Sequence, residues 1–333
     1  MIRTLAGLAN PAYTIYEGDD QLNQQHLGAL LVLISAAGFG TLAIFIKMAY
    51  AAGANTLTVL TLRFILAALL LWIFLKPLGI SPRLGTKTAL KLCLMGIIGY
   101  GSMSFLFASS LQYLPASLAE MLLFTYPILV SIMSFIIGVE QFTWQKGLAL
   151  AICVSGLFLI LGVSVASISQ LGVTLGLGSA VVYSCYIMIS NRVLKDVHSL
   201  VATTYVCSGA ACVFAIYTWM THQLILTLPA AGWLALLGIA VLGTIVGILC
   251  FFAGIGKIGA ANASIISTAE PAITVLLSAL ILGEQLTLLQ GMGGLLIVTS
   301  ILILQLCATN TTNGEILDAT IKLKTATAQE QDE

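Results

Sequence analysis

Charged residues are scarce in this chain. Only 8% of its 333 residues are Asp, Glu, Lys or Arg, while 59% are hydrophobic and the mean hydropathy is +1.06. Soluble domains carry about 25% charged residues, so most of the surface of this chain is expected to face lipid. The net charge is zero, which argues against nucleic acid as a partner.

Cysteines with the spacing of redox or metal sites are also missing. The seven cysteines are odd in number, and no two of them form a Cys-x-x-Cys pair. This pattern argues against a disulfide framework and against a metal centre. We expect these residues to pack as small apolar side chains in helices, and we expect no metal and no cofactor.

Motifs for catalysis and nucleotide binding are absent as well. The chain has no His-Glu-x-x-His sequence, and no Asp falls within a predicted membrane span. Its one Gly-Lys pair, Gly256-Lys257, is followed by Ile258, where a P-loop needs Ser or Thr. These absences argue against a membrane enzyme and against an ATP-driven pump.

Long apolar runs fill most of the sequence. A membrane-spanning helix needs roughly 20 predominantly apolar residues. Acidic residues interrupt the amino-terminal segment, which argues against a signal peptide. We predict an all-α integral membrane protein with ten transmembrane helices, at 27–49, 56–75, 92–112, 117–138, 145–165, 171–193, 200–220, 232–254, 261–282 and 288–308.

The basic residues predict the orientation of these spans. Lys and Arg occur in the terminal segments and around the loops after spans two, four, six and eight, whereas the opposite loops contain neither. By the positive-inside rule, both termini are predicted to be cytoplasmic. We expect a multi-pass protein of the bacterial inner membrane, with a plastid membrane as the alternative.

The sequence repeats itself at an offset of 144 residues. Glu140-Gln141-Phe142-Thr143 recurs as Glu284-Gln285-Leu286-Thr287, and Pro127 recurs as Pro271. We divide the chain into a cytosolic segment 1–26, a five-span repeat 27–165, a second five-span repeat 171–308, and a polar cytosolic tail 309–333. Because five is odd, the two repeats are predicted to be inverted in the membrane, with a substrate site between them.

Four charged residues fall inside predicted spans, where each is costly and needs a reason. Glu270 is the deepest and is predicted either to contact a substrate amine or a coupling proton, or to stay protonated in a structural role. Arg63 is predicted to bind a carboxylate in the cavity or to form an ion pair, with snorkelling to the interface as the alternative. Lys47 and Glu120 are predicted at the outer mouth, Lys47 snorkelling and Glu120 in an ion pair with Lys47 or Arg63.

Prolines and further polar residues complete the candidate site. Pro127 and Pro271 lack the backbone N–H and are predicted to kink their helices. Aromatic and hydroxyl side chains are further candidates for substrate binding, although hydroxyl and glycine residues also let helices pack closely; the candidates are Thr41, Tyr100, Tyr126 and Tyr183. Glu140 and Glu284 are predicted to have structural roles at helix ends.

These features together resemble a known family. The chain is similar to the EamA-type carriers of the drug/metabolite transporter superfamily through Ala43–Lys47, Leu62-Arg63-Phe64, Tyr113–Ser117, Thr125-Tyr126-Pro127, Glu270-Pro271-Ala272 and Leu282–Thr287. It departs from the family pattern at Val139, where Gly is usual, and at Phe39 and Tyr183, where Trp is common.

The resemblance implies a secondary transporter that exports small metabolites, such as amino acids or related compounds, by alternating access. It also implies a central cavity, with spans five and ten at the periphery. The alternative is a passive channel or a non-transporting membrane scaffold. The expected partners are a small-molecule substrate and the lipid bilayer. The sequence does not decide whether the protein forms a homodimer.

Overall fold

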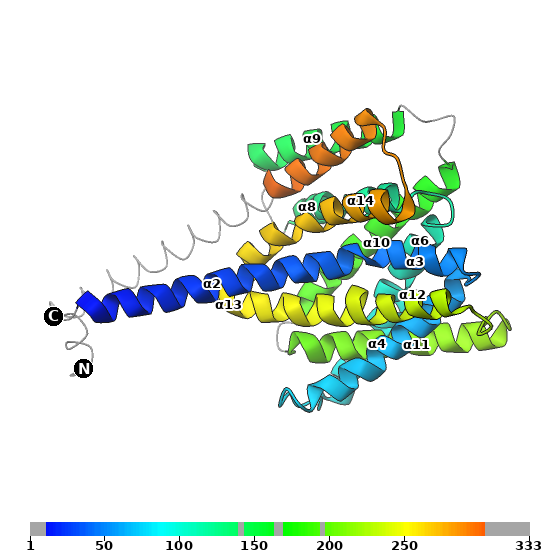
Figure 1. The fold of residues 1–333 in the computed structure, drawn as a ribbon, viewed down its shortest axis with the longest axis horizontal. Coiled ribbons are helices and arrows are strands. Elements are labelled where there is room, and N and C mark those ends of the chain that lie inside the picture. The colour runs from blue at the N-terminus through cyan, green and yellow to red at the C-terminus, as the bar shows by residue number, and fades with distance from the viewer. Residues whose placement is uncertain (1–10, 139–142, 163–168, 194–196, 304–333) are drawn as a thin grey trace.

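The chain folds into a bundle of helices (Figure 1). The computed structural model describes residues 11–138, 143–162, 169–193 and 197–303, and these residues contain no β-strand. The predicted tail 309–333 and Glu140 lie outside the described residues. An all-helical chain agrees with the low charge and long apolar runs, because a helix satisfies its own backbone hydrogen bonds in lipid.

The first half contains α2 to α9. In order, these are α2 (Pro11–Gly40), α3 (Leu42–Ala51), α4 (Thr56–Leu75), α5 (Thr86–Leu94), the π-helix η2 (Met95–Tyr100), α6 (Gly101–Ser110), α7 (Ala116–Leu123), α8 (Tyr126–Ile136) and α9 (Trp144–Gly162). The segment 1–26 is thus helical from Pro11 onward, continuous with the first predicted span.

The second half follows a similar order. It contains α10 (Gln170–Val193), α11 (Ser199–Met220), α12 (Ala230–Ala240), the π-helix η3 (Val241–Val246), α13 (Gly247–Ser267), α14 (Ala269–Leu282) and a last helix, Leu288–Ile303. Each half therefore has a π-helix within its third predicted span, and π-helices often accompany functional sites.

Seven of the described helical segments are long and apolar enough to cross a membrane. At three of the ten predicted positions the described apolar helices are shorter: Trp144–Leu159, Ala269–Leu282 and Leu288–Ile303. One predicted boundary is wrong. Helical structure continues through residues 255–260, which the sequence predicts as a loop, and α13 ends at Ser267. This end lies where Pro271 removes the N–H that would bond to the Ser267 carbonyl.

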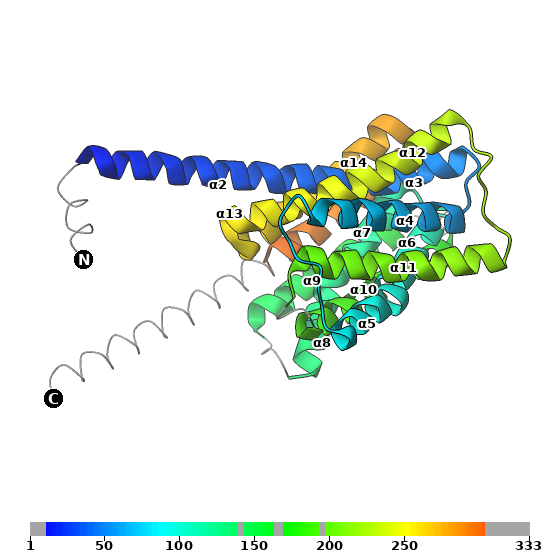
Figure 2. The ribbon, with the colours of Figure 1, turned by 90° about the horizontal axis from the view of Figure 1, so that it is seen from below.

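The helix contacts follow the repeat. Helices α2 and α3 pack against α13 and α12, and α10 packs against α6 in the equivalent arrangement (Figures 1 and 2). Helices α4 and α11, which are equivalent to each other, also pack together. Helix α9 and the last helix lie together at one edge of the bundle, as the resemblance implied. The repeat in sequence is thus also a repeat in packing.

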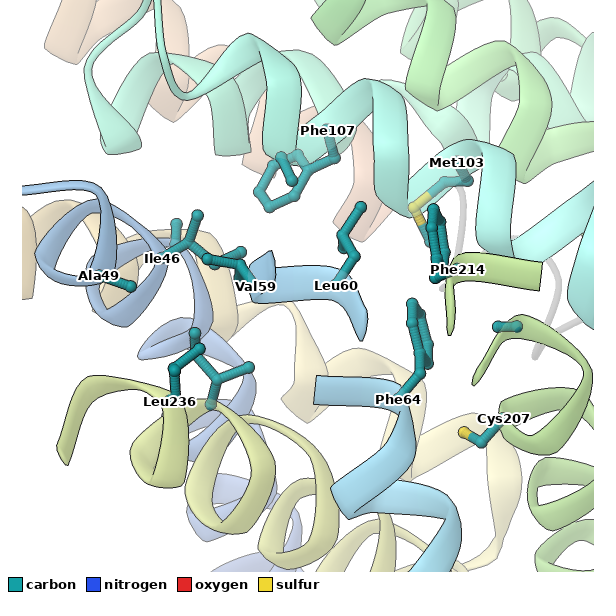
Figure 3. Close-up of a cluster of buried hydrophobic side chains, with 14 of the residues drawn as sticks. Ile46, Ala49, Val59, Leu60, Phe64, Met103, Phe107, Cys207, Phe214 and Leu236 are labelled. Carbon is teal, nitrogen blue, oxygen red and sulfur yellow. The ribbon is translucent and has the colours of Figure 1, made fainter. Parts of the chain in front are cut away.

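The largest apolar core joins both halves. Phe64 of α4 stacks on Phe214 of α11 with ring centroids 5.7 Å apart, and both side chains are buried (Figure 3). Val59 and Leu60 extend this cluster along α4, with Leu236 of α12 beside it. Met103, Phe107 and Cys207 belong to the same cluster and also line a central cavity. This core holds the helices that carry the candidate site.

Candidate functional site

A central cavity of about 320 Å³ lies between the two halves. Small-molecule sites commonly have volumes of about 300–1,000 Å³. Six of the residues predicted for substrate binding or for the outer mouth line this cavity: Arg63, Tyr100, Glu120, Tyr126, Tyr183 and Glu270. They come from α4, η2, α7, α8, α10 and α14, so the fold gathers residues that are far apart in the sequence.

Equivalent positions of the two repeats line the cavity together. Of the twenty described residues that line it, fourteen form seven pairs separated by 144 positions: Phe39 and Tyr183, Leu42 and Tyr186, Arg63 and Cys207, Ser104 and Ile248, Phe107 and Phe251, Leu123 and Ser267, and Tyr126 and Glu270. The two halves therefore present equivalent backbone positions to one space. Most pairs differ in chemistry, so a similar frame carries an asymmetric set of side chains.

Breaks between helices position Tyr126 and Glu270 at the cavity. Helix α7 ends at Leu123 and α8 begins at Tyr126, immediately before Pro127. Helix α13 ends at Ser267 and α14 begins at Ala269, two residues before Pro271. Each proline lacks the N–H that would continue the backbone ladder, and each break therefore lies next to a cavity residue, Tyr126 or Glu270.

One basic and two acidic residues share the cavity. Arg63 and Glu120 are each only 3% exposed, and Glu270 is half-buried. The Arg63 Nη2 donates a hydrogen bond of 3.3 Å to the Tyr100 hydroxyl. Among the described residues, none forms a hydrogen bond or ion pair with the carboxyl group of Glu120 or Glu270. These two carboxyl groups are therefore available to a ligand.

Aromatic rings form much of the remaining wall. Tyr126 and Tyr183 meet edge to face with centroids 4.7 Å apart, and Tyr186 stacks beside Tyr183 at 6.1 Å. Tyr100 approaches Tyr186 at 5.8 Å. Tyrosine presents both an apolar ring and a hydroxyl group, so this wall suits a ligand with apolar and polar parts.

Two predicted residues lie elsewhere. The Thr41 hydroxyl donates to the Gly38 carbonyl at 2.6 Å between α2 and α3, and Thr41 is not among the residues that line the cavity. Lys47 lines a separate open depression of about 410 Å³ and forms an ion pair of 3.5 Å with Glu284. Glu120, expected at the outer mouth in an ion pair with Lys47 or Arg63, lines the central cavity and forms an ion pair with neither.

Glu284 has a structural role that its sequence position only partly indicated. Its carboxylate accepts hydrogen bonds from the Ala116 N–H at 2.6 Å, and from the Ser117 N–H and hydroxyl at 3.2 and 2.9 Å. It thereby caps the amino terminus of α7, where Pro115 provides no side-chain cap. One carboxylate of the second half thus holds α7 and Lys47 of the first half.

Sequence reasoning missed Ser104. This residue lines the cavity, is 2% exposed, and its hydroxyl group has no hydrogen-bond partner among the described residues. A single serine in an apolar helix gives no distinctive sequence signal. Its position one turn after Tyr100 was the available hint, because residues four apart share a helix face.

Comparison with known proteins places this chain in a family. The model of the EamA-like transporter family matches residues 26–162 and 170–306, two segments that begin at the repeat offset. The chain is 29% identical over 296 residues to the uncharacterized transporter YcbK of Bacillus subtilis (strain 168), covering 85% of this chain and 94% of that protein. It is 30% identical over 223 residues to the uncharacterized transporter sll1319 of Synechocystis sp., covering 62% and 65%.

A solved crystal structure of another protein shares the fold. It has a TM-score of 0.60 and 18% sequence identity, and the match covers 85% of this chain and 98% of the other. The apolar helices and the two matched segments identify a multi-pass integral membrane protein built from two repeats. The chain belongs to the EamA-like transporter family of the drug/metabolite transporter superfamily.

Proposed function

We propose that this protein is a secondary transporter that exports small metabolites, such as amino acids or related compounds, by alternating access. In this proposal the chain crosses the membrane ten times as two inverted repeats, with both termini in the cytoplasm. Rocking of one repeat against the other exposes the central cavity to each side in turn. The bacterial inner membrane is the proposed location.

One observation carries this proposal. Arg63, Glu120 and Glu270 all line a cavity of about 320 Å³ between the repeats, although charge is costly in a membrane. Structural charges would be expected to neutralise one another directly, yet no ion pair joins these three residues. Charged side chains that are buried or half-buried in a space of ligand size, and that form no ion pair with one another, favour a role in binding cargo.

The roles follow from the chemistry of the side chains. Glu270 and Glu120 are acceptors for a cationic group of the substrate, or for a coupling proton. The tyrosines around Tyr126 and Tyr183 contact the uncharged part, since rings contribute large apolar area. The charged groups need not cross lipid, because the substrate and both acids stay inside the cavity throughout the transport cycle.

The test is the Glu270→Gln substitution. Metabolites released into the medium are profiled for cells that express wild-type or variant protein, and the metabolite that differs is then assayed in proteoliposomes. We expect Glu270→Gln to lower the flux at least about tenfold, as for loss of a charge-assisted hydrogen bond, with unchanged thermal unfolding. Glu17→Gln is the control, since it neutralises an acid in the amino-terminal segment ahead of the first predicted span, and it should transport normally.

Two outcomes would contradict the proposal. Wild-type flux from Glu270→Gln would remove Glu270 from the site. Flux that is linear in substrate concentration and cannot drive counterflow would favour the passive channel, and no flux of any profiled metabolite would favour a scaffold.

A further inference from the structure

The guanidinium group of Arg63 has few partners for a buried cation. Arginine has five N–H donors, and the side chain is only 3% exposed. The recorded hydrogen bond runs from Nη2 to the Tyr100 hydroxyl at 3.3 Å, and Nε has no partner among the described residues. Cation–π contact with the Phe64 ring at 5.1 Å satisfies none of these donors. A buried charge in this condition calls for an anion.

Ser104 provides a second unused donor in the same cavity. The nine other serines that are buried among the described residues each donate a hydrogen bond, most of them to a carbonyl three or four residues earlier in their own helix. Ser104 is 2% exposed and makes no such bond with a described residue. It follows η2 by four residues, one turn beyond the Tyr100 that contacts Arg63.

Both unused donors belong to one half of the protein. The repeat-equivalent positions of Arg63 and Ser104 are Cys207 and Ile248, and both of these also line the cavity. Neither replacement can offer a charged or strong hydrogen-bond donor. The cavity therefore contains donors that suit an anion, and it also contains the unpaired carboxyl groups of Glu120 and Glu270, which attract a cation.

We propose that Arg63, Tyr100 and Ser104 form a subsite for the carboxylate group of the transported molecule, which also carries a cationic group. The proposal rests on the transport function given above. A guanidinium binds a carboxylate through two parallel hydrogen bonds, and the Ser104 hydroxyl supplies a further one. A phosphate ester, with more negative charge, would face two carboxyl groups in the same small cavity, which disfavours it.

The experiment compares ligands that differ only in their charged groups. Purified wild-type protein in detergent is titrated with phenylalanine and leucine, with their decarboxylated amines, with their deaminated acids, and with phenyl phosphate. Dissociation constants come from the concentration dependence of the unfolding temperature. We expect at least one zwitterion to stabilise the protein, and each amine or acid alone to bind at least about tenfold more weakly.

Variants then assign the carboxylate to the subsite. Ser104→Ala should weaken zwitterion binding about tenfold and leave the affinity for the amine unchanged. Arg63→Lys should also weaken zwitterion binding, because lysine lacks the planar fork. Ser110→Ala is the matched control, since this serine is on the same helix, is buried, and donates to Phe107. It should leave every dissociation constant unchanged.

Three results would overturn this inference. They are equal weakening of amine and zwitterion by Ser104→Ala, tighter binding of phenyl phosphate than of any zwitterion, and no stabilisation by any zwitterion. The transport function is tested separately: saturable flux of an amine in proteoliposomes would preserve that function while refuting the carboxylate subsite.

Discussion

Removal of the Glu284 carboxylate is expected to loosen the contact between the two halves. Gly283 ends α14 in the left-handed conformation with φ of 65°, which favours glycine because it has no Cβ. This turn places Glu284 at the amino terminus of α7, where its carboxylate accepts three hydrogen bonds and pairs with Lys47. The substitution Glu284→Ala removes all four interactions and leaves the α7 N–H groups without their cap.

The loss of unfolding free energy in Glu284→Ala can be worked out from these contacts. Loss of a helix cap costs about 1 kcal/mol, and a hydrogen bond to a charged group contributes about 1.5–3 kcal/mol. The Lys47 pair adds under about 1 kcal/mol, because its side chains are 26% and 12% exposed and water screens them. Since one carboxylate makes every contact, these contributions do not add fully, and we expect a total of about 2–4 kcal/mol.

The assay is thermal unfolding in detergent, followed by intrinsic fluorescence. Unfolding entropies per residue place the expected shift for a chain of this length at about 3–6 °C. Lys47→Met, which removes only the ion pair, should lower the unfolding temperature by less than half of that shift. Gln285→Ala is the matched control, because Gln285 is the exposed neighbour in the same loop. An unfolding temperature for Glu284→Ala equal to that of Gln285→Ala would refute the capping role.

Two further predictions concern helix packing and topology. A Cβ atom at Gly209 would meet the Cys93 carbonyl, and one at Gly96 would meet the Val206 carbonyl. Either alanine substitution should destabilise the protein by about 1–3 kcal/mol through overpacking. Gly291→Ala is the control, because a Cβ there meets no atom within 4 Å, and it should be neutral or slightly stabilising in the same unfolding assay. Equal stability of all three variants would contradict the close contacts at Gly209 and Gly96. A fluorescent reporter fused to either terminus should fluoresce in the cytoplasm, as the positive-inside rule predicts, and a periplasmic-only signal would reverse the orientation.

The symmetric part of the molecule could be predicted from the sequence. The offset of 144 residues pairs seven sets of cavity positions, because duplicated segments fold alike. The prolines predicted the interruptions near Tyr126 and Glu270, because a missing N–H is a local property of the chain. Burial of Arg63 and Glu270 in a shared space followed from the cost of charge in lipid.

The pairings between distant segments could not be predicted in this way. Lys47 was expected to snorkel to the interface, and it instead forms an ion pair with Glu284 of the other half. The free hydroxyl group of Ser104 depends on how η2 and α6 pack against α4, which periodicity along one helix does not reveal. Thr41 has a hydroxyl group suited to substrate binding and falls in the first predicted span, yet the local hydrogen bond to the Gly38 carbonyl occupies that hydroxyl group.

The most direct test of the central claim is counterflow in proteoliposomes that contain the purified protein. Vesicles are loaded with an unlabelled metabolite from the profiling experiment, and entry of the labelled metabolite is measured without any other energy source. An alternating-access carrier with its site at Arg63, Glu120 and Glu270 predicts saturable accumulation above the external concentration, lost in Glu270→Gln and kept in Glu17→Gln. Entry that only equilibrates, rises linearly with concentration, or is unchanged in Glu270→Gln would contradict the account.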